Sequence, residues 1–304
     1  MFPNLRSYHV RLIFVFTTIC LLVGLLSLGV GISIVNQGVI IEVTNRVRQD
    51  LNAAWAIFRA PAEKMKPVFA LAADDSLMRD GVSERSTEAI AKKLREIRDA
   101  LDLDFAGGLL LGGDPLQVSY DGSTLPAPEN QEDFRFLAIE QRMRVSGVAV
   151  LEQEFLLRED PVLAEQAITP SVKTPRAEIR PETEETRGMT LVCATPVISE
   201  GVVSAVLYGG ILVNGNSELI DRIRDVIFRL KAYGDLELGT TTVFLEDVRI
   251  ATNVVDADGR RAIGTQVSEE VKDQVLGEGL RWSDRAFVVN RWYRTAYDPI
   301  IDVY

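Results

Sequence analysis

The stretch LIFVFTTICLLVGLLSLGVGISIV, residues 12–35, contains no charged residue and decides how the chain is arranged. As a helix it reaches roughly 36 Å, whereas the hydrocarbon core of a membrane is about 30 Å thick. A cleaved signal peptide has an apolar run of about 7 to 15 residues and a small-x-small cleavage site, which residues 29–37 lack. We therefore expect an uncleaved transmembrane helix.

Arginines flank this segment on both sides, at Arg6, Arg11, Arg46 and Arg48, so the charge bias alone orients it weakly. Long domains that follow a first helix are translocated largely regardless of their charge. We expect residues 1–11 in the cytoplasm, the helix in the inner (cytoplasmic) membrane, and residues 36–304 extracytoplasmic.

The composition indicates a folded exterior portion, with 47% hydrophobic and 25% charged residues. The formal net charge of −11 argues against nucleic acid as a partner. Of the two cysteines, Cys20 lies in the span, so Cys193 has no partner for a disulfide within the exterior portion.

The absence of several sequence motifs excludes most classes of catalytic and cofactor chemistry from the exterior portion. The only histidine, His9, precedes the span, which removes histidine-based catalysis and metal binding from the exterior portion. No phosphate-binding loop or haem attachment motif occurs, and Asp256-Ala-Asp258-Gly259 predicts a turn and not a calcium loop. We expect no cofactor, no metal and no catalytic site in this chain, and leave open whether a longer protein is an enzyme.

Large residues recur along one stripe from Val43 to Phe69, which predicts a stalk helix continuing from the span. Pro61 and Pro67 predict a kink or a split near Ala60. A second amphipathic pattern between Ile90 and Leu101 completes a stalk and helical region over residues 36–104.

The period changes at residue 105, where strands are expected. Residues 105–113 and 116–120 predict a hairpin, residues 129–145 a helix, and residues 148–156 a third strand. An acidic, proline-bearing loop is expected over residues 169–185, followed by a hairpin of residues 189–198 and 202–213. In this interpretation, residues 105–215 form one module whose last strand pairs with its first.

A linking helix over residues 216–238 is predicted, with Asn216 as its cap and Gly234 just past its end. The plan then repeats over residues 239–304: a hairpin, a short helix at residues 267–276 and two more strands. This second copy lacks the last strand, so we expect a fragment or a chain cut before it. The predicted fold class is α+β, with antiparallel sheets.

Several blocks in this order resemble the double Cache sensor family, in its Cache 3/Cache 2 fusion type. The blocks are ETRGM at 185–189, ATPV at 194–197, GTTTVF at 239–244, DVRIATN at 247–253, RAIGT at 261–265, RAFVVN at 285–290, and Trp292-Tyr293. The resemblance covers about residues 37–304.

The resemblance implies two PAS-like modules, membrane-distal (105–215) and membrane-proximal (239–304), that form the sensing input of a bacterial signal transducer. It also implies an output domain beyond this chain, foremost a histidine kinase, with a chemoreceptor as the alternative. The remaining alternatives are a membrane-anchored structural protein and an exterior enzyme using paired carboxylates. Helix displacement would carry the signal across the membrane.

PAS-like sheets curve around a pocket in which a few polar groups fix a small ligand. The candidate ligand-binding residues are polar or aromatic residues on predicted strands or on the segment just before one: Tyr293, Thr295, Tyr297, Arg285 and Trp282 in the second module, and Tyr120, Glu154, Thr190 and Tyr208 in the first. Arg285 would neutralise a carboxylate or an amino acid. The alternative is that these side chains are ordinary packing residues.

A membrane and a small-molecule ligand are therefore the expected partners. The stripe through Val43, Val47 and Leu51 also predicts a parallel homodimer. Packing of the stripe against its own domain is the alternative.

Overall fold

The computed structural model describes residues 5–128, 133–228 and 239–304. The chain divides into two units, Met1–Gln49 and Asp50–Tyr304. Within the second unit we call residues 105–215 the first module and residues 239–304 the second module. The end of the predicted linking helix, including Gly234, lies outside the described residues.

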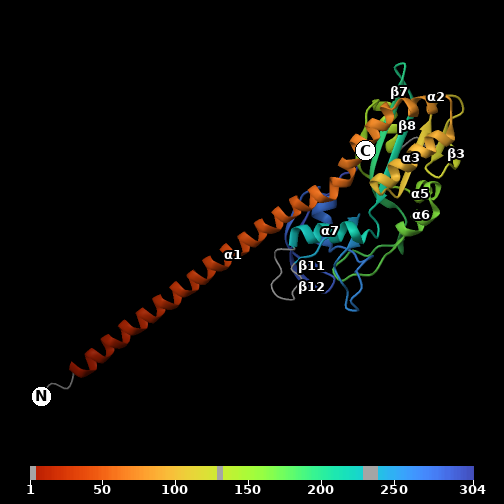
Figure 1. The fold of residues 1–304 in the computed structure, drawn as a ribbon. Helices are drawn as coiled ribbons and strands as arrows, with labels where there is room; N and C mark the ends of the chain where they lie inside the picture. The colour runs from red at the N-terminus through yellow and green to blue at the C-terminus, as the bar shows by residue number, and fades with distance from the viewer. Residues whose placement is uncertain (1–4, 129–132, 229–238) are drawn as a thin grey trace. The chain divides into compact units, whose positions relative to one another are not determined.

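A single helix, α1 (Leu5–Asp74), contains both the predicted span and the stalk (Figure 1). Among the described residues it is the one helix long and apolar enough to cross a membrane. The expected split near Ala60 does not occur, because the helix continues through Pro61 and Pro67. Side chains on one face, from Phe58 to Phe69, are buried in the second unit, and this packing holds the helix across both prolines.

The first module is built on a six-stranded antiparallel sheet of order β3-β2-β1-β8-β7-β4. As predicted, the last strand pairs with the first, with Ala106 opposite Gly209. Between β7 and β8 the chain reverses at Glu200 and Gly201, and both have positive φ. The strands are β1 (Phe105–Leu110), β2 (Leu116–Ser119), β3 (Thr124–Pro126), β4 (Val145–Leu151), β7 (Gly188–Ser199) and β8 (Val202–Leu212).

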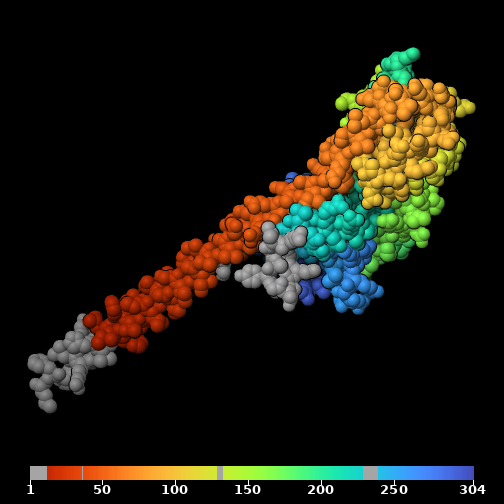
Figure 2. Space-filling model, in the orientation of Figure 1, coloured from red at the N-terminus to blue at the C-terminus, as the bar shows by residue number. Residues whose placement is uncertain are grey.

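Helices cover both faces of this sheet. One face packs against α1, α2 (Ser76–Ser83) and α3 (Thr87–Leu101), with Phe69, Ile90 and Leu94 in its core. Figure 2 shows α2 and α3, coloured orange to yellow, at the surface of the molecule. Alternate strand residues face the other way, toward α4 (Phe134–Gln141), α5 (Gln153–Glu159) and α6 (Pro161–Ala167).

The prediction of a third strand over residues 148–156 is correct for its first residues and wrong for its last ones. The strand β4 ends at Leu151, and α5 begins at Gln153 after an extended Glu152. The apolar residues Phe155 and Leu156 continue the pattern of β4 in sequence, but they pack onto the sheet from the helical layer. A short apolar run therefore concealed the change from period 2 to period 3.6.

The acidic loop expected over residues 169–185 is held by two short strands, β5 (Thr169–Pro170) and β6 (Glu184–Glu185). Between them the loop lies on the second module. The backbone N–H of Val172 donates to Gly264 (2.8 Å), and that of Glu269 donates to Arg176 (2.9 Å). The loop thus links the two modules.

The second module follows α7 (Ser217–Phe228), which Asn216 caps by accepting from the Leu219 N–H (2.9 Å). It contains two hairpins that form separate two-stranded sheets. Its elements are β9 (Thr242–Leu245), β10 (Val248–Thr252), α8 (Glu269–Lys272), a π-helical turn (Asp273–Gly277), β11 (Trp282–Val288) and β12 (Arg291–Tyr297). After β12 the chain returns to the first module, where the Val303 N–H donates to Val148 (2.9 Å) at the edge strand β4.

Candidate functional site

A buried polar cluster lies on the face of the first module's sheet that α4 to α6 cover. Its centre is Glu159, the last residue of α5, whose side chain is 2% exposed. Its Oε1 accepts hydrogen bonds from the Tyr208 hydroxyl (2.9 Å) and from Gln117 Nε2 (3.1 Å), and Arg135 Nη1 lies 3.7 Å away. Strands β2 and β8 and helices α4 and α5 therefore meet at one carboxylate.

Arg135 is positioned by its own helix terminus. Asp133 caps α4 by accepting from the Arg135 backbone N–H (2.8 Å), and the same carboxylate accepts from the guanidinium at 2.5 and 3.0 Å. The guanidinium also lies over the rings of Phe155 and Tyr208. With two carboxylates within 4 Å, this buried arginine is compensated within the protein.

Burial raises the pKa of Glu159 to about 7, against the opposing effect of Arg135. Burial and the charge of Glu159 also raise the pKa of Tyr208 well above its ordinary value, so the phenol stays protonated and donates. The cluster is thus a set of mutually satisfied groups whose net charge changes near neutral pH.

The structure places only Tyr208, of the four residues predicted in the first module, in this cluster. Tyr120 lies on the opposite face, under Arg98 (4.4 Å), and Thr190 Oγ1 donates to the Ala149 carbonyl (2.9 Å) on the next strand. The prediction for Glu154 as a strand residue is wrong. It lies exposed in the first turn of α5, because β4 has already ended.

The candidate residues of the second module divide between two faces of the hairpin β11–β12. Directly opposite pairs share a face, so Trp282 with Tyr297, and Ala286 with Tyr293, point the same way, and Thr295 lies between the two tyrosines. This face is half-buried, and its aromatic residues Trp282 and Tyr297 pack with Phe244 of β9 and Val271 of α8. Arg285 projects from the other face, exposed and over Trp292 (5.0 Å).

On the buried face the aromatic residues form one group. Phe244 of β9 lies 6.0 Å from Tyr297, and Trp282 packs in the same cluster. The indole Nε1 of Trp282 is buried and has no hydrogen-bond partner among the described residues. Thr295 uses its hydroxyl within the hairpin, donating to the Asp284 carbonyl (3.0 Å).

Arg249 of β10, which the sequence-based reasoning missed, faces this group. It lies over Phe244 (4.8 Å) and donates to three hydroxyls, those of Thr265 (2.9 Å), Thr242 (2.8 Å) and Thr252 (3.4 Å). In the sequence, Arg249 is the single charged residue of VRIAT, and a lone charge in a predicted strand could have marked it as functional. The structure shows that every residue of this strand is buried. Arg135 could have been noticed in the same way, because it stands between two aromatic residues, Phe134 and Phe136.

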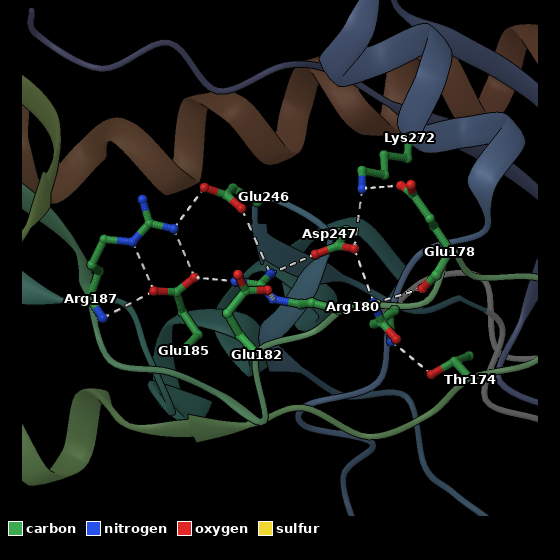
Figure 3. A network of polar contacts seen from close by, with 10 residues as sticks. Thr174, Glu178, Arg180, Glu182, Glu185, Arg187, Glu246, Asp247 and Lys272 are labelled. Carbon is green, nitrogen blue, oxygen red and sulfur yellow. Dashed lines mark hydrogen bonds and ion pairs between the residues drawn. The ribbon is translucent and has the colours of Figure 1, made fainter.

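A second polar network joins the two modules (Figure 3). Arg180 of the connecting loop donates to Asp247 Oδ1 (2.7 Å) in the β9–β10 turn and to Glu185 Oε2 (3.1 Å). Arg187, the residue before β7, donates to the same Glu185 (2.8 Å) and to Glu246 of the turn (2.7 Å). Each arginine therefore bridges carboxylates from both modules.

No group of three or more metal-ligating side chains occurs within residues 5–128, 133–228 and 239–304. The arrangement offers buried donors and aromatic faces, which hold small organic molecules by hydrogen bonding and packing.

Residues 211–303 match the family model described as single cache domain 3. Among proteins with curated descriptions, none matches this chain. The first module lies almost wholly outside the matched residues.

Three solved structures are similar to the chain at low identity. The periplasmic domain of LuxQ from Vibrio cholerae is 13% identical, with a TM-score of 0.37, over 73% of this chain and 82% of that chain. Methyl-accepting chemotaxis protein X is 10% identical, with a TM-score of 0.41, over 80% of this chain and 86% of that chain. The isoleucine-bound sensory domain of the chemoreceptor Tlp3 from Campylobacter jejuni is 9% identical, with a TM-score of 0.38, over 84% of this chain and 87% of that chain.

A helix long and apolar enough to span a membrane, followed in the chain by a Cache domain, is the arrangement of a membrane protein with an extracytoplasmic segment. The Cache sensor domain that the sequence blocks predicted is confirmed over residues 211–303.

Proposed function

We propose that this chain is the extracytoplasmic sensing input of a bacterial signal transducer in the inner membrane, with a histidine kinase as the foremost output. The single observation that carries the proposal is the Cache match at residues 211–303, in a chain whose α1 contains an apolar segment long enough to span a membrane. A buried arginine and a buried indole N–H, which has no hydrogen-bond partner among the described residues, lie within the matched residues, where a sensor needs ligand-binding groups.

The signal would leave the second module through the hairpin β11–β12. Tyr297 faces the aromatic group, and the next residue, Asp298, accepts a hydrogen bond from Trp55 Nε1 of α1 (2.9 Å). Arg281, before β11, binds the same carboxylate (2.7 Å). A ligand that shifts the hairpin would thus act directly on α1, the helix that contains the membrane-spanning segment.

The coupling required is modest. A preference of the ligand for one hairpin position by about 1 to 3 kcal/mol is typical of allosteric proteins and biases an output equilibrium. In a parallel homodimer, contacts between the α1 stripes at Val47 and Leu51 would convert this bias into a relative movement of two helices.

The test uses residues 1–304 in lipid nanodiscs. Thermal unfolding is measured against a library of carboxylates, amino acids, sugars, nucleobases and cations, and at least one class should raise the unfolding temperature in a saturable manner. Absence of any response would contradict a sensing role. Separately, Val202→Cys in a Cys20→Ser background should react with a membrane-impermeant maleimide in intact spheroplasts, because Val202 is exposed and Cys193 is buried.

A further inference from the structure

The buried cluster of the first module holds two carboxylates and, among the described residues, one cation within ion-pair distance of them. That cation is Arg135, and Asp133 takes most of it, accepting from Nε (3.0 Å) and Nη2 (2.5 Å). Arg135 Nη1 donates to Gln117 Oε1 (3.3 Å) and lies 3.7 Å from Glu159, beyond hydrogen-bond distance. When ionised, Glu159 is therefore a buried carboxylate that shares its only counter-ion with a stronger partner.

The other groups around Glu159 do not correct this imbalance. Glu159 ends α5, and the free backbone carbonyls at the end of a helix disfavour a negative charge. Burial outweighs the effect of Arg135 and raises the pKa of Glu159 to about 7. Three further ionisable groups face the cluster without placing a cation within 4 Å of Glu159: Arg158, whose guanidinium donates to the Pro126 carbonyl (2.5 Å), Asp160, which caps α6, and Tyr304, which lies near Asp133 and Arg135.

A proton is the cation that fits this position. The groups in contact with Glu159 are donors, namely the Tyr208 hydroxyl, the Gln117 amide and the Arg135 guanidinium. A metal ion requires several oxygen ligands and an ammonium group requires several acceptors, which these donors do not supply. The side chains of Glu159 and Arg135 are each 2% exposed, and the rings of Phe155 and Tyr208 enclose the guanidinium.

The proton decides between two pairings of Arg135. With Glu159 protonated, Asp133 is the one ionised carboxylate beside the guanidinium and holds it, as in the structure. With Glu159 ionised, opposite charges attract across 3.7 Å of buried space and draw the guanidinium toward Glu159. Because Asp133 also caps α4 through the Arg135 N–H (2.8 Å), this exchange affects the start of α4 and the end of α5 together.

The end of α5 is connected to the second module through α6. Asp160 ends α5 and also caps α6, so the two helices meet at one residue. The last residue of α6, Ala167, accepts a hydrogen bond from Asn214 Nδ2 (2.8 Å), and Asn214 is fully buried. The next residue, Gly215, donates its N–H to the Ile250 carbonyl of β10 (2.8 Å). A movement at Glu159 would thus reach the segment through which the chain enters the second module.

We propose that the first module is a receptor for protons: loss of one proton from Glu159 draws Arg135 away from Asp133 and moves the joint between α5 and α6, and uptake of the proton restores the observed pairing. The rearrangement needs only the cluster, whereas its role as a signal rests on the sensing function proposed above. The chain would then combine a response to pH with a response to a ligand.

The experiment compares the wild type with Glu159→Gln by amide hydrogen exchange, using residues 1–304 in nanodiscs. Glutamine has the shape of the protonated carboxyl group and does not titrate. At about pH 5.5 the two proteins should exchange alike over residues 153–168 and 213–216. At about pH 8.5 the wild type should exchange faster there by about two- to tenfold, because its ionised carboxylate loosens the joint. Comparison at equal pH cancels the intrinsic pH dependence of exchange.

Glu154→Gln is the matched control, because Glu154 lies exposed in the first turn of the same helix. It should follow the wild type at both pH values. The same response in Glu154→Gln and Glu159→Gln, or equal exchange of the wild type and Glu159→Gln at about pH 8.5, would overturn the proposal.

Two further variants test the pairing through the midpoint of the pH profile, corrected for intrinsic exchange. Asp133→Asn keeps a capping side chain for α4 and removes the competing charge, so the midpoint should fall by about one pH unit. Tyr208→Phe removes a donor to the carboxylate, so the midpoint should rise by about one pH unit. A cluster that serves only packing would not give opposite shifts, and a rise in Asp133→Asn would contradict the proposed exchange of partners.

If Glu159→Gln already differs from the wild type at about pH 5.5, the opposite shifts in Asp133→Asn and Tyr208→Phe decide the question, and their absence overturns the proposal. A library ligand found without this pH response would leave the sensing function standing and remove the proton as its signal. The pH response without any library ligand would leave the proton-driven rearrangement standing and contradict the sensing of small molecules.

Discussion

The hydroxyl of Tyr208, on the central strand β8, donates a 2.9 Å hydrogen bond to Glu159, the last residue of α5. This bond ties the sheet of the first module to its covering helices through a carboxylate with a pKa raised to about 7. Because Arg135 and Gln117 contact the same carboxylate, its ionisation state affects four elements at once.

The first prediction concerns pH. Burial raises the pKa of Glu159 from 4.5 to about 7, so the folded state keeps this proton at pH values where the unfolded chain has lost it. The unfolded chain then binds fewer protons, and the free energy of unfolding should fall as pH rises from about 4.5 to 7, by roughly 3 kcal/mol at most.

Chemical denaturation of the wild type and of Glu159→Gln at several pH values measures this contribution. The variant should lose that part of the pH dependence, since glutamine does not titrate. An identical pH profile in the two proteins would show that Glu159 titrates with an ordinary pKa.

The second prediction concerns the close approach of β1 to Tyr208. A Cβ built on Gly107 would overlap the Tyr208 hydroxyl, so Gly107→Ala must displace a fully buried side chain. We expect a loss of about 1 to 3 kcal/mol in the free energy of unfolding. Gly112→Ala is the control, because nothing lies within 4 Å of its built Cβ, and equal effects of both would refute the steric explanation.

The third prediction concerns the network between the modules. A double-mutant cycle with Arg180→Met and Asp247→Asn should give a coupling energy of about 1 to 3 kcal/mol, because both side chains are nearly buried. The exposed pair Arg222 and Glu218 on α7 should couple by less than about 0.5 kcal/mol. Equal coupling in the two cycles would mean that the loop contact does not hold the modules together.

The fourth prediction concerns the link from β12 to α1. Trp55→Phe keeps the ring but removes the indole N–H that donates to Asp298, so the hairpin β11–β12 should open more readily. Amide exchange over residues 291–298 should be faster by about two- to tenfold. Trp292→Phe, on the exposed face, should not change it; unchanged exchange in Trp55→Phe would remove this contact from the proposed signal path.

The fifth prediction concerns the homodimer. Val47→Cys in a Cys20→Ser background should form an intermolecular disulfide on mild oxidation in membranes, because the stripe would place position 47 at the helix contact. Asn45→Cys, about 200° around the helix, should cross-link much less. Equal cross-linking at both positions, or none at either, would contradict packing through the stripe.

Local patterns predicted most of the elements correctly. Runs with alternating apolar residues predicted the pairing of β1 with β2 and the hairpin β7–β8, and Asn216 predicted the start of α7; the structure has all three. The two failures have different causes: packing overruled the local effect of proline in α1, and a short apolar run hid the change of period after β4. The helix α1 does not split near Ala60 because the stripe around Pro61 is buried, and Glu154 was assigned to a strand because the apolar Phe155 and Leu156 follow β4 closely in sequence.

The buried charged residues were harder to identify from the sequence. The sequence pointed to Tyr208, Tyr297 and Trp282 as polar or aromatic strand residues, but not to Glu159 or Arg249. A charged residue is normally solvent-exposed, and the sequence alone does not show that several elements enclose it. Arg285 was chosen for its charge, yet the pairing register places it on the outer face.

By itself the sequence determined the apolar segment, the order of helices and strands and the presence of a Cache domain, because these depend on composition and short-range periodicity. Only the tertiary structure decided which charges are paired. Arg135 pairs with Asp133 and Glu159, whereas the hydrogen-bond acceptors of Arg249 are hydroxyls, and Glu159 and Thr265 reach these arginines from other segments of the chain. Charge compensation is a property of distances in space, and strand register and helix packing set those distances.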